Sequence, residues 1–153
     1  MSLFMKKILF VIVAILVAAA SFALETKNTK GELSVKLNIN INGKTDLKAT
    51  LFDNSSSVAL VELLEKGAVT IDMHDFSNFE KVGDLPVMLP RNDSPTDTDS
   101  GDLILYLGKR FVIYYDKNSW DFTRLGKVDG VTKAELKSIL GKGNVKAVLS
   151  LAK

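Results

Sequence analysis

Apolar and polar residues alternate along much of this chain, which is the pattern of β-strands buried on one face. The clearest stretch is 32–41, where the apolar face carries Leu33, Val35, Leu37, Ile39 and Ile41. Asn42-Gly43 follows, a dipeptide suited to the positive φ angles of a type I′ turn. The alternation then resumes as far as Leu51, so we predict a β-hairpin over residues 32–53.

Two segments carry helical signals instead. Residues 56–66 have apolar positions at helical spacing behind N-cap candidates at 54–57, and Gly67 is a natural C-terminal stop. Thr132 and Glu135 have the spacing of a capping box and predict a short helix that ends near Gly141.

The remaining apolar segments predict further strands. We expect strands at 69–74, 122–128 and 145–151, and a hairpin over 102–115 that turns at Gly108-Lys109. Residues 75–101 contain all three prolines and are expected to form a long irregular loop, interrupted by a short strand near 87–89. Roughly seven or eight short strands with two helices at the edges predict a mainly β fold, a closed antiparallel barrel.

The first 23 residues have the three-part layout of a secretory signal. Lys6 and Lys7 precede an apolar run over 8–20, and Ser21-Phe22-Ala23 supplies small residues at the −3 and −1 positions. We interpret 1–23 as a Sec signal peptide, with 1–4 as extra residues ahead of the start at Met5, and 24–153 as a single exported domain, periplasmic or extracellular. Retention of the run as an anchor is the alternative, although the run is shorter than the ~20 residues that span a bilayer.

Charge and composition exclude several functions. Two of the 20 Lys and Arg residues lie in the leader, and the other 18 balance the 18 Asp and Glu, so we expect no nucleic-acid partner. The absence of cysteine excludes disulfides, thiolate nucleophiles and Cys-based metal sites. The acidic run 97–102 lacks the central Gly and distal Glu of a calcium loop, so we expect no metal there. We also expect no cofactor and, once the signal peptide is removed, no membrane contact.

Three stretches, in this order, resemble the small bacterial cyclophilin-like domains. The first is Asn42-Gly43 and then Leu51-Phe52-Asp53-Asn54-Ser55, leading into a helix that ends in Leu63-Leu64. The second is FEKVGDLP at 79–86. The third is Ser100-Gly101-Asp102-Leu103, followed by two tyrosine-rich strands and FTRLGK at 122–127. The resemblance covers 33–151 and implies an eight-stranded antiparallel barrel of cyclophilin type, capped by short helices.

The resemblance also bears on whether the chain is an enzyme. True cyclophilins place an arginine just after a Phe-His pair, beside a Gln-Gly-Gly segment, whereas this chain has His74-Asp75-Phe76 and no glutamine at all. We therefore expect a non-enzymatic exported module that binds a peptide or a small molecule. A peptidyl-prolyl isomerase of reduced cyclophilin type is the alternative, with Arg91, just after Pro90, as the candidate catalytic residue. A structural or partner-binding envelope protein is the second alternative.

Five residues are the candidate ligand-binding set: Glu80, Lys81, Arg91, Tyr115 and Trp120. Glu80-Lys81 lies beside the proline-bearing loop, either as an exposed ion pair that sets the loop or as a polar contact at the mouth of a groove. Trp120 falls in a polar turn, where an exposed indole would be a platform for a ligand. His74 is the only histidine, which leaves little for a Ser-His-Asp relay or a His-rich metal site.

Overall fold

The structure is a computed structural model that describes residues 32–153, without the side chains of Glu32 and Ser34. The signal peptide predicted at 1–23 lies outside the described residues. Nine strands and two helices follow one another in the described part: β1 (Glu32–Ile41), β2 (Thr45–Phe52), α2 (Ser55–Glu65), β3 (Val69–Phe76), β4 (Glu80–Asp84), β5 (Ser94–Thr98), β6 (Asp102–Tyr106), β7 (Arg110–Tyr114), β8 (Asn118–Val128), α3 (Lys133–Leu140) and β9 (Val145–Leu151).

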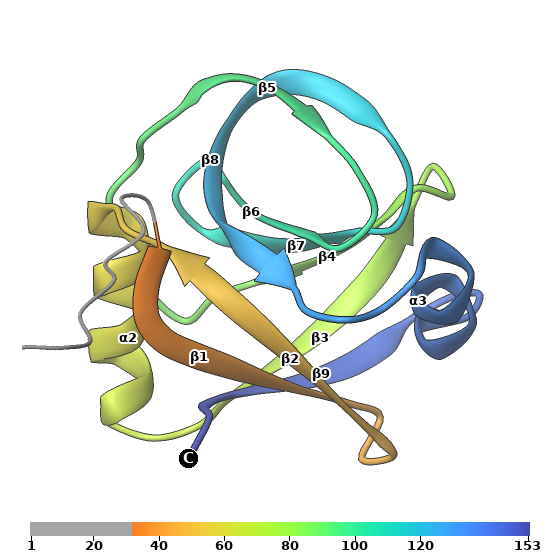
Figure 1. Cartoon of the computed structure of the whole chain (residues 1–153), viewed down its shortest axis with the longest axis horizontal. Coiled ribbons are helices and arrows are strands. Elements are labelled where there is room, and N and C mark those ends of the chain that lie inside the picture. The colour runs from red at the N-terminus through yellow and green to blue at the C-terminus, as the bar shows by residue number, and fades with distance from the viewer. Residues whose placement is uncertain (1–31) are drawn as a thin grey trace, which may run out of the picture.

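The strands form a closed antiparallel barrel (Figure 1). Their order is β2-β1-β9-β3-β4-β7-β6-β8, and β2 pairs with β8 to close the ring, with Leu51 opposite Gly126. The ninth strand, β5, pairs with the first half of β8 and lies outside the ring. The predicted barrel of about eight strands with two short helices is therefore confirmed.

Two tight turns set the register of the hairpins. Asn42 and Gly43 both have positive φ, at 53° and 68°, as a type I′ turn requires, so the predicted first hairpin is confirmed. The second hairpin turns at Leu107 and Gly108, with φ of 52° and 74°, one residue before the predicted position.

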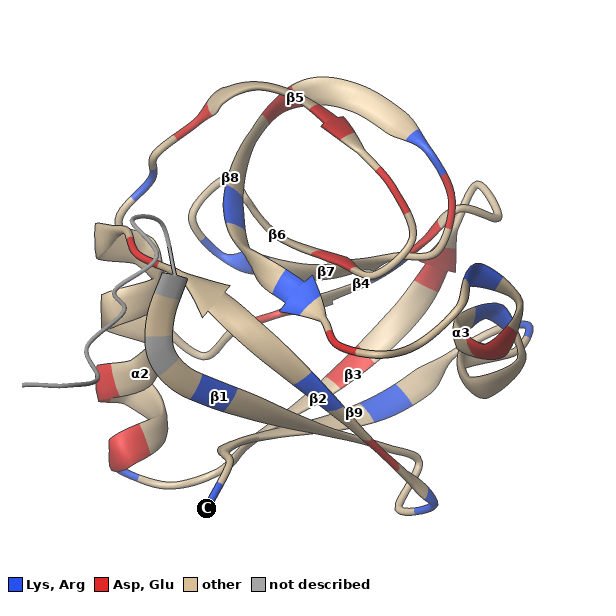
Figure 2. Cartoon of the chain, in the orientation of Figure 1, with Lys and Arg blue, Asp and Glu red and all other residues tan. Residues whose placement is uncertain are grey.

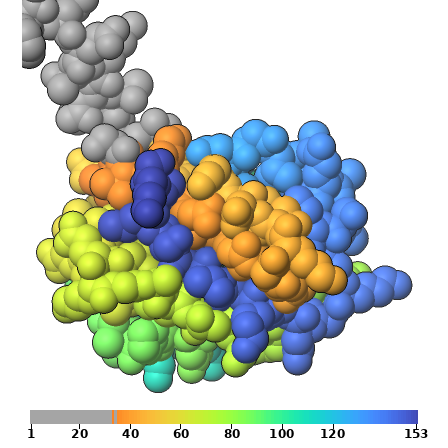
Figure 3. All heavy atoms as spheres, turned by 90° about the horizontal axis from the view of Figure 1, so that it is seen from below, coloured from red at the N-terminus to blue at the C-terminus, as the bar shows by residue number. Residues whose placement is uncertain are grey.

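The core fills the inside of the barrel. Inward residues such as Leu37, Ile39 and Ile113 are fully buried, and each helix adds two leucines, Leu60 and Leu64 from α2 and Leu136 and Leu140 from α3. The helices lie on opposite sides of the barrel in Figure 1. Seen from below, the β1–β2 hairpin lies directly against the C-terminal strand β9, which its residues 37–41 contact in register (Figure 3).

Residues 75–101 are more regular than predicted. The segment holds β4 and β5, while 87–89 forms no strand. β4 was missed because Glu80 and Lys81 are charged yet buried, so the apolar alternation is hidden. β5 was missed because it is polar and contains Pro95, a residue that strands tolerate at an edge. β8 also starts earlier than predicted, at Asn118, so Trp120 lies in a strand and not in a turn.

Acidic and basic residues are interspersed along the strands (Figure 2). Neither helix of residues 32–153 has the length and apolar character needed to cross a bilayer.

Candidate functional site

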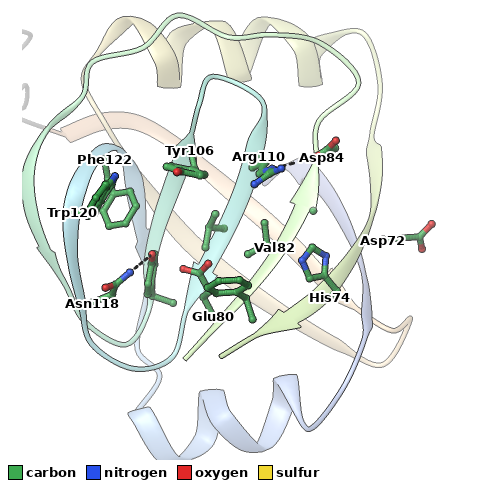
Figure 4. A pocket seen from close by; sticks show the side chains of 14 residues that line it. Asp72, His74, Glu80, Val82, Asp84, Tyr106, Arg110, Asn118, Trp120 and Phe122 are labelled. Carbon is green, nitrogen blue, oxygen red and sulfur yellow. Dashed lines mark hydrogen bonds and ion pairs between the residues drawn. The ribbon is translucent and has the colours of Figure 1, made fainter. Parts of the chain in front are cut away.

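A cleft of about 610 Å³ opens on the outer face of the barrel (Figure 4). This volume is within the range of small-molecule sites. The cleft is lined by Asp72, His74 and Phe76 from β3, Glu80, Val82, Gly83 and Asp84 from β4, Tyr106 from β6, Arg110, Val112 and Tyr114 from β7, and Asn118, Trp120 and Phe122 from β8.

The lining follows from the pleat, since every second residue of a strand faces outward. Strand register then arranges these residues in three rows: Phe76, Glu80 and Tyr114 in the first, His74, Val82, Val112 and Ile104 in the second, and Asp84, Arg110 and Tyr106 in the third. An apolar floor therefore lies between a row that holds a buried carboxyl and a row that holds an exposed ion pair.

A second apolar cluster, separate from the barrel core, makes the floor and one wall. Its buried members are Val82, Ile104, Val112, Tyr114 and Phe122. The Phe122 ring lies 5.7 Å from that of Tyr114 and 6.0 Å from that of Tyr106, measured between centroids. Trp120 stands beside Phe122 with 64% of its surface exposed. Such packed aromatic pairs hold the cleft in shape without a ligand.

Glu80 supplies the buried carboxyl beside the apolar floor of the cleft. It is only 9% exposed, and its Oε2 has no hydrogen-bond partner among the described residues. Burial raises the pKa of Glu80 above its usual value, and a hydrogen bond from the Tyr114 hydroxyl opposes the shift without cancelling it. The side-chain amide of Asn118 donates to the Tyr114 oxygen at 3.3 Å. Burial and the hydrogen bond to Glu80 raise the pKa of Tyr114 in turn, so this phenol stays protonated.

The other two carboxylates of the cleft have basic partners at its edges. Asp84 pairs with Arg110 at 3.8 Å, and Asp72, which points away from the floor in Figure 4, pairs with Lys146 at 3.4 Å. All four side chains are more than half exposed, so these pairs add little stability. Within residues 32–153, Glu80 is the carboxylate of the cleft without a basic partner.

Comparison with known proteins agrees with this architecture. A family model described as the cyclophilin-like family matches residues 39–150. The chain belongs to the cyclophilin-like family. A search of curated proteins finds no match. Among solved structures, the chain is similar to the solution structure of the hypothetical protein AF2241 from Archaeoglobus fulgidus, with a TM-score of 0.56 and 13% identity, over 79% of this chain and 97% of that one. At this identity the likeness concerns the fold alone.

The cyclophilin-like barrel brings two of the five predicted site residues, Glu80 and Trp120, into the cleft. Arg91 lies outside it, in a smaller hollow on the other side of Trp120, where its Nε donates to Asp93 at 2.8 Å. It is therefore already paired.

Lys81 and Tyr115 face the opposite way. Lys81 is fully buried and donates to Asp75 at 2.8 Å and to the carbonyls of Gly141 and Gly143 at 3.0 and 2.7 Å, while the Tyr115 hydroxyl donates to the same Asp75. Glu80-Lys81 is therefore not an exposed ion pair, because neighbours in a strand point to opposite faces. Lys81 ties the cleft strands to the end of α3.

Several cleft residues were missed from the sequence, above all Arg110, Tyr114, Asn118 and Phe122. Outward alternation on β7 predicts Arg110, Val112 and Tyr114 as one set, but the four residues after Arg110 are all buried, so the apolar run hides that signal. The acidic run 97–102 turns inward in part, since Asp102 is buried and pairs with Lys127 at 3.0 Å. No group of three metal-ligating side chains occurs in the described range 32–153.

Proposed function

We propose that this cyclophilin-like domain is a non-enzymatic module that binds a small molecule or a peptide side chain in the outer cleft. The observation that carries the proposal is Trp120, which stands 64% exposed at the rim of a preformed apolar cleft. An exposed indole beside an apolar cleft supports ligand binding, because aromatic residues are the usual anchors of binding sites.

Binding is favoured over catalysis by the chemistry available. The chain has one histidine and no cysteine, and His74 is exposed at the edge of the cleft. The remaining polar groups of the cleft are suited to orienting a ligand, because a few placed polar groups in an apolar pocket provide specificity.

We also propose that the domain works after export, in the periplasm or outside the cell. The support is the signal-like layout of residues 1–23, with Lys6-Lys7 before the apolar run and Ser21-Phe22-Ala23 after it. N-terminal sequencing of the exported protein should find Leu24 as the first residue, and an intact N-terminus on membrane-bound protein would refute the cleavage.

Trp120 also supplies the test of binding, since it is the only tryptophan. Titration with a broad library of fragments and short peptides should find ligands that quench its emission saturably and shift the NMR methyl resonances of Val82 and Val112 on the floor. Leu136 is a residue of α3 that is buried in the barrel core, so its methyl resonances serve as the internal control and should not shift. A library that leaves both the emission and the floor methyls unchanged would refute the proposal.

A prolyl isomerase is the second candidate, and Arg110 is what favours it. This guanidinium, unlike that of Arg91, lies in the cleft next to the apolar row. A hydrogen bond from it to a prolyl nitrogen would weaken the amide resonance behind the ~18–20 kcal/mol barrier. A protease-coupled assay decides between the functions: acceleration lost in Arg110→Ala but kept in Arg91→Ala would establish the isomerase, and no acceleration leaves the binding module.

A further inference from the structure

We propose that Glu80 recognises a protonated amine whose apolar body lies on the Val82–Val112 floor and against the aromatic wall. The inference rests on the proposed function, since it names the class of ligand that the cleft takes. It is carried by the Glu80 carboxyl, which lines the cleft and whose buried Oε2 has no hydrogen-bond partner in the described part of the chain.

The first step is the cost of that arrangement. A carboxyl oxygen removed from water without a hydrogen bond destabilises the folded protein, and buried polar groups are almost always satisfied. Residues 32–153 show only one other such side-chain atom, Oδ1 of Asn38, on the far β1 strand. An unsatisfied acceptor on a carboxyl that lines the cleft is explained if a donor from a ligand completes it.

The second step is the charge of the neighbours. Asp84 and Asp72 have their cations in Arg110 and Lys146, whereas Glu80 has none. An incoming cation therefore finds one carboxylate in the cleft that is not already neutralised. The lower dielectric around a buried carboxylate strengthens its attraction to a cation, and the desolvation of both charges opposes that gain.

The third step is the surroundings of the carboxyl. Strand register places Glu80 directly between Phe76 and Tyr114, so aromatic rings flank it on both sides. Aromatic rings attract ammonium groups through their faces, and a cation held by a carboxylate between rings gains from both. The adjoining row of Val82 and Val112 offers room for an apolar body, not for a second charge.

A divalent metal fits less well, because such ions take several oxygen ligands and the described residues place no third acidic or histidine side chain with Glu80. The competing interpretation is that Glu80 stays protonated, as its raised pKa allows, and donates to a neutral ligand. The two interpretations predict opposite pH dependence.

Three probes of similar size test the charge: phenethylamine, 2-phenylethanol and 3-phenylpropanoate, titrated into the whole domain at pH 8 and followed by the Val82 and Val112 methyl resonances. We expect the amine to bind at least about tenfold more tightly than the alcohol. We expect no saturable binding of the carboxylate. Equal or tighter binding of the alcohol overturns the inference, and this comparison requires no variant.

Glu80→Gln keeps the shape and removes the charge. It should weaken phenethylamine at least about tenfold and leave the alcohol unchanged. Glu62→Gln, on the exposed side of α2, is the matched control and should change neither. Circular dichroism of each variant checks the fold. Amine affinity that survives Glu80→Gln overturns the inference.

The pH profile is the third readout. Amine affinity should fall as pH drops through the raised pKa of Glu80, because only the carboxylate attracts the cation. The titratable groups that face Glu80 are His74 on β3 and Tyr114 on β7, with Arg110 further along the cleft, and the charge of Asp75 acts on Glu80 from the opposite face of β3. His74→Gln removes the neighbouring imidazole and is the control for its contribution; this variant should retain the profile. Affinity that rises on acidification overturns the inference in favour of a protonated Glu80.

A fourth probe, Nα-acetyl-lysine amide, distinguishes a lysine side chain of a peptide from a free aromatic amine as the ligand. Tighter binding of this probe than of phenethylamine indicates a lysine side chain of a peptide, and weaker binding indicates a free aromatic amine. If library fragments bind in the cleft and neither amine does, the amine inference fails and the binding module stands. If nothing in the library binds, both fail.

Discussion

Replacing Lys81 with methionine should be among the most destabilising single changes in this barrel. Its ammonium is fully buried and uses all three donors, on Asp75 and on the carbonyls of Gly141 and Gly143. Methionine has a similar length and can fill the space, but it leaves the Asp75 carboxylate and two carbonyls without their donor.

The magnitude follows from these contacts. Removing one partner of a buried ion pair costs about 3–5 kcal/mol. The Asp75 side chain is 25% exposed and the loop at 141–143 is exposed, so water replaces part of what is lost. We therefore expect a loss of about 3 kcal/mol in the free energy of unfolding, or roughly 10–15 °C in Tm for a domain of this size.

Urea denaturation followed by circular dichroism measures the effect. Lys142→Met is the matched control, since Lys142 lies exposed between the two glycines, and its cost should stay within about 0.5 kcal/mol. A Lys81→Met protein less than about 1 kcal/mol below wild type would refute the assignment of Lys81 as the tie between the sheet and α3.

The same network gives a pH dependence with a fixed sign. Burial acts to raise the pKa of Asp75, but hydrogen bonds from Lys81 and Tyr115 outweigh it, so the pKa lies below the usual value. A depressed pKa contributes stability above the unfolded-state pKa, near 4, and this contribution is lost as pH falls through the folded-state value. The difference between wild type and Lys81→Met should therefore shrink below about pH 4, and a difference that persists there would count against the ion pair.

Three further changes test the barrel and the cleft. Gly126→Ala places a Cβ against the Thr50 carbonyl where β2 meets β8 and should cost about 2–3 kcal/mol in urea denaturation. At Gly130 a Cβ meets nothing within 4 Å, but the φ of 60° strains an L residue, so Gly130→Ala should cost about 1–2 kcal/mol, and a cost at Gly126 no greater than this would contradict the prediction. Thr132→Ala removes the oxygen that caps α3 and should cost about 1 kcal/mol by the same measurement. Trp120→Phe should leave Tm within about 2 °C, because the indole is mostly exposed, and a larger fall would show that it supports the fold.

Local chemistry made much of the fold predictable. Strict alternation with Asn42-Gly43 located the first hairpin, and the Thr132–Glu135 capping box located α3, where both halves of the box are present. These signals depend on residues near one another in the chain, so tertiary context did not overturn them.

The missed strands show where such signals fail. β4 carries a fully buried lysine, whose charge predicts a surface position. Its partners at Gly141 and Gly143 lie 60 or more positions away, so the local sequence does not reveal them. β5 is polar throughout and exists as a strand because β8 offers it an edge. Hydrogen bonds between distant segments leave no local pattern.

The cleft could be predicted only in part for the same reason. Glu80 and Trp120 were identified as candidates, but the cleft they share depends on which of Glu80 and Lys81 faces outward, and a shift of one residue in register reverses that choice. Arg110 and Tyr114 join them through the pairing of β4 with β7, which the sequence does not reveal.

The pairing of the first strand, β1, with the last, β9, determines when this domain can fold. β1 is flanked by β2 and by β9, so Leu37 does not meet its partner Leu151 until almost the whole chain is available. Ring closure thus requires contacts between the two ends of the chain, and such non-local pairing is slow. A ribosome-bound or partly synthesised chain would hold hairpins but no barrel. Late closure would keep the chain unfolded enough to pass through a translocation channel, as the export proposed above requires. The pairing of β9 with β1 would then be the step that completes folding.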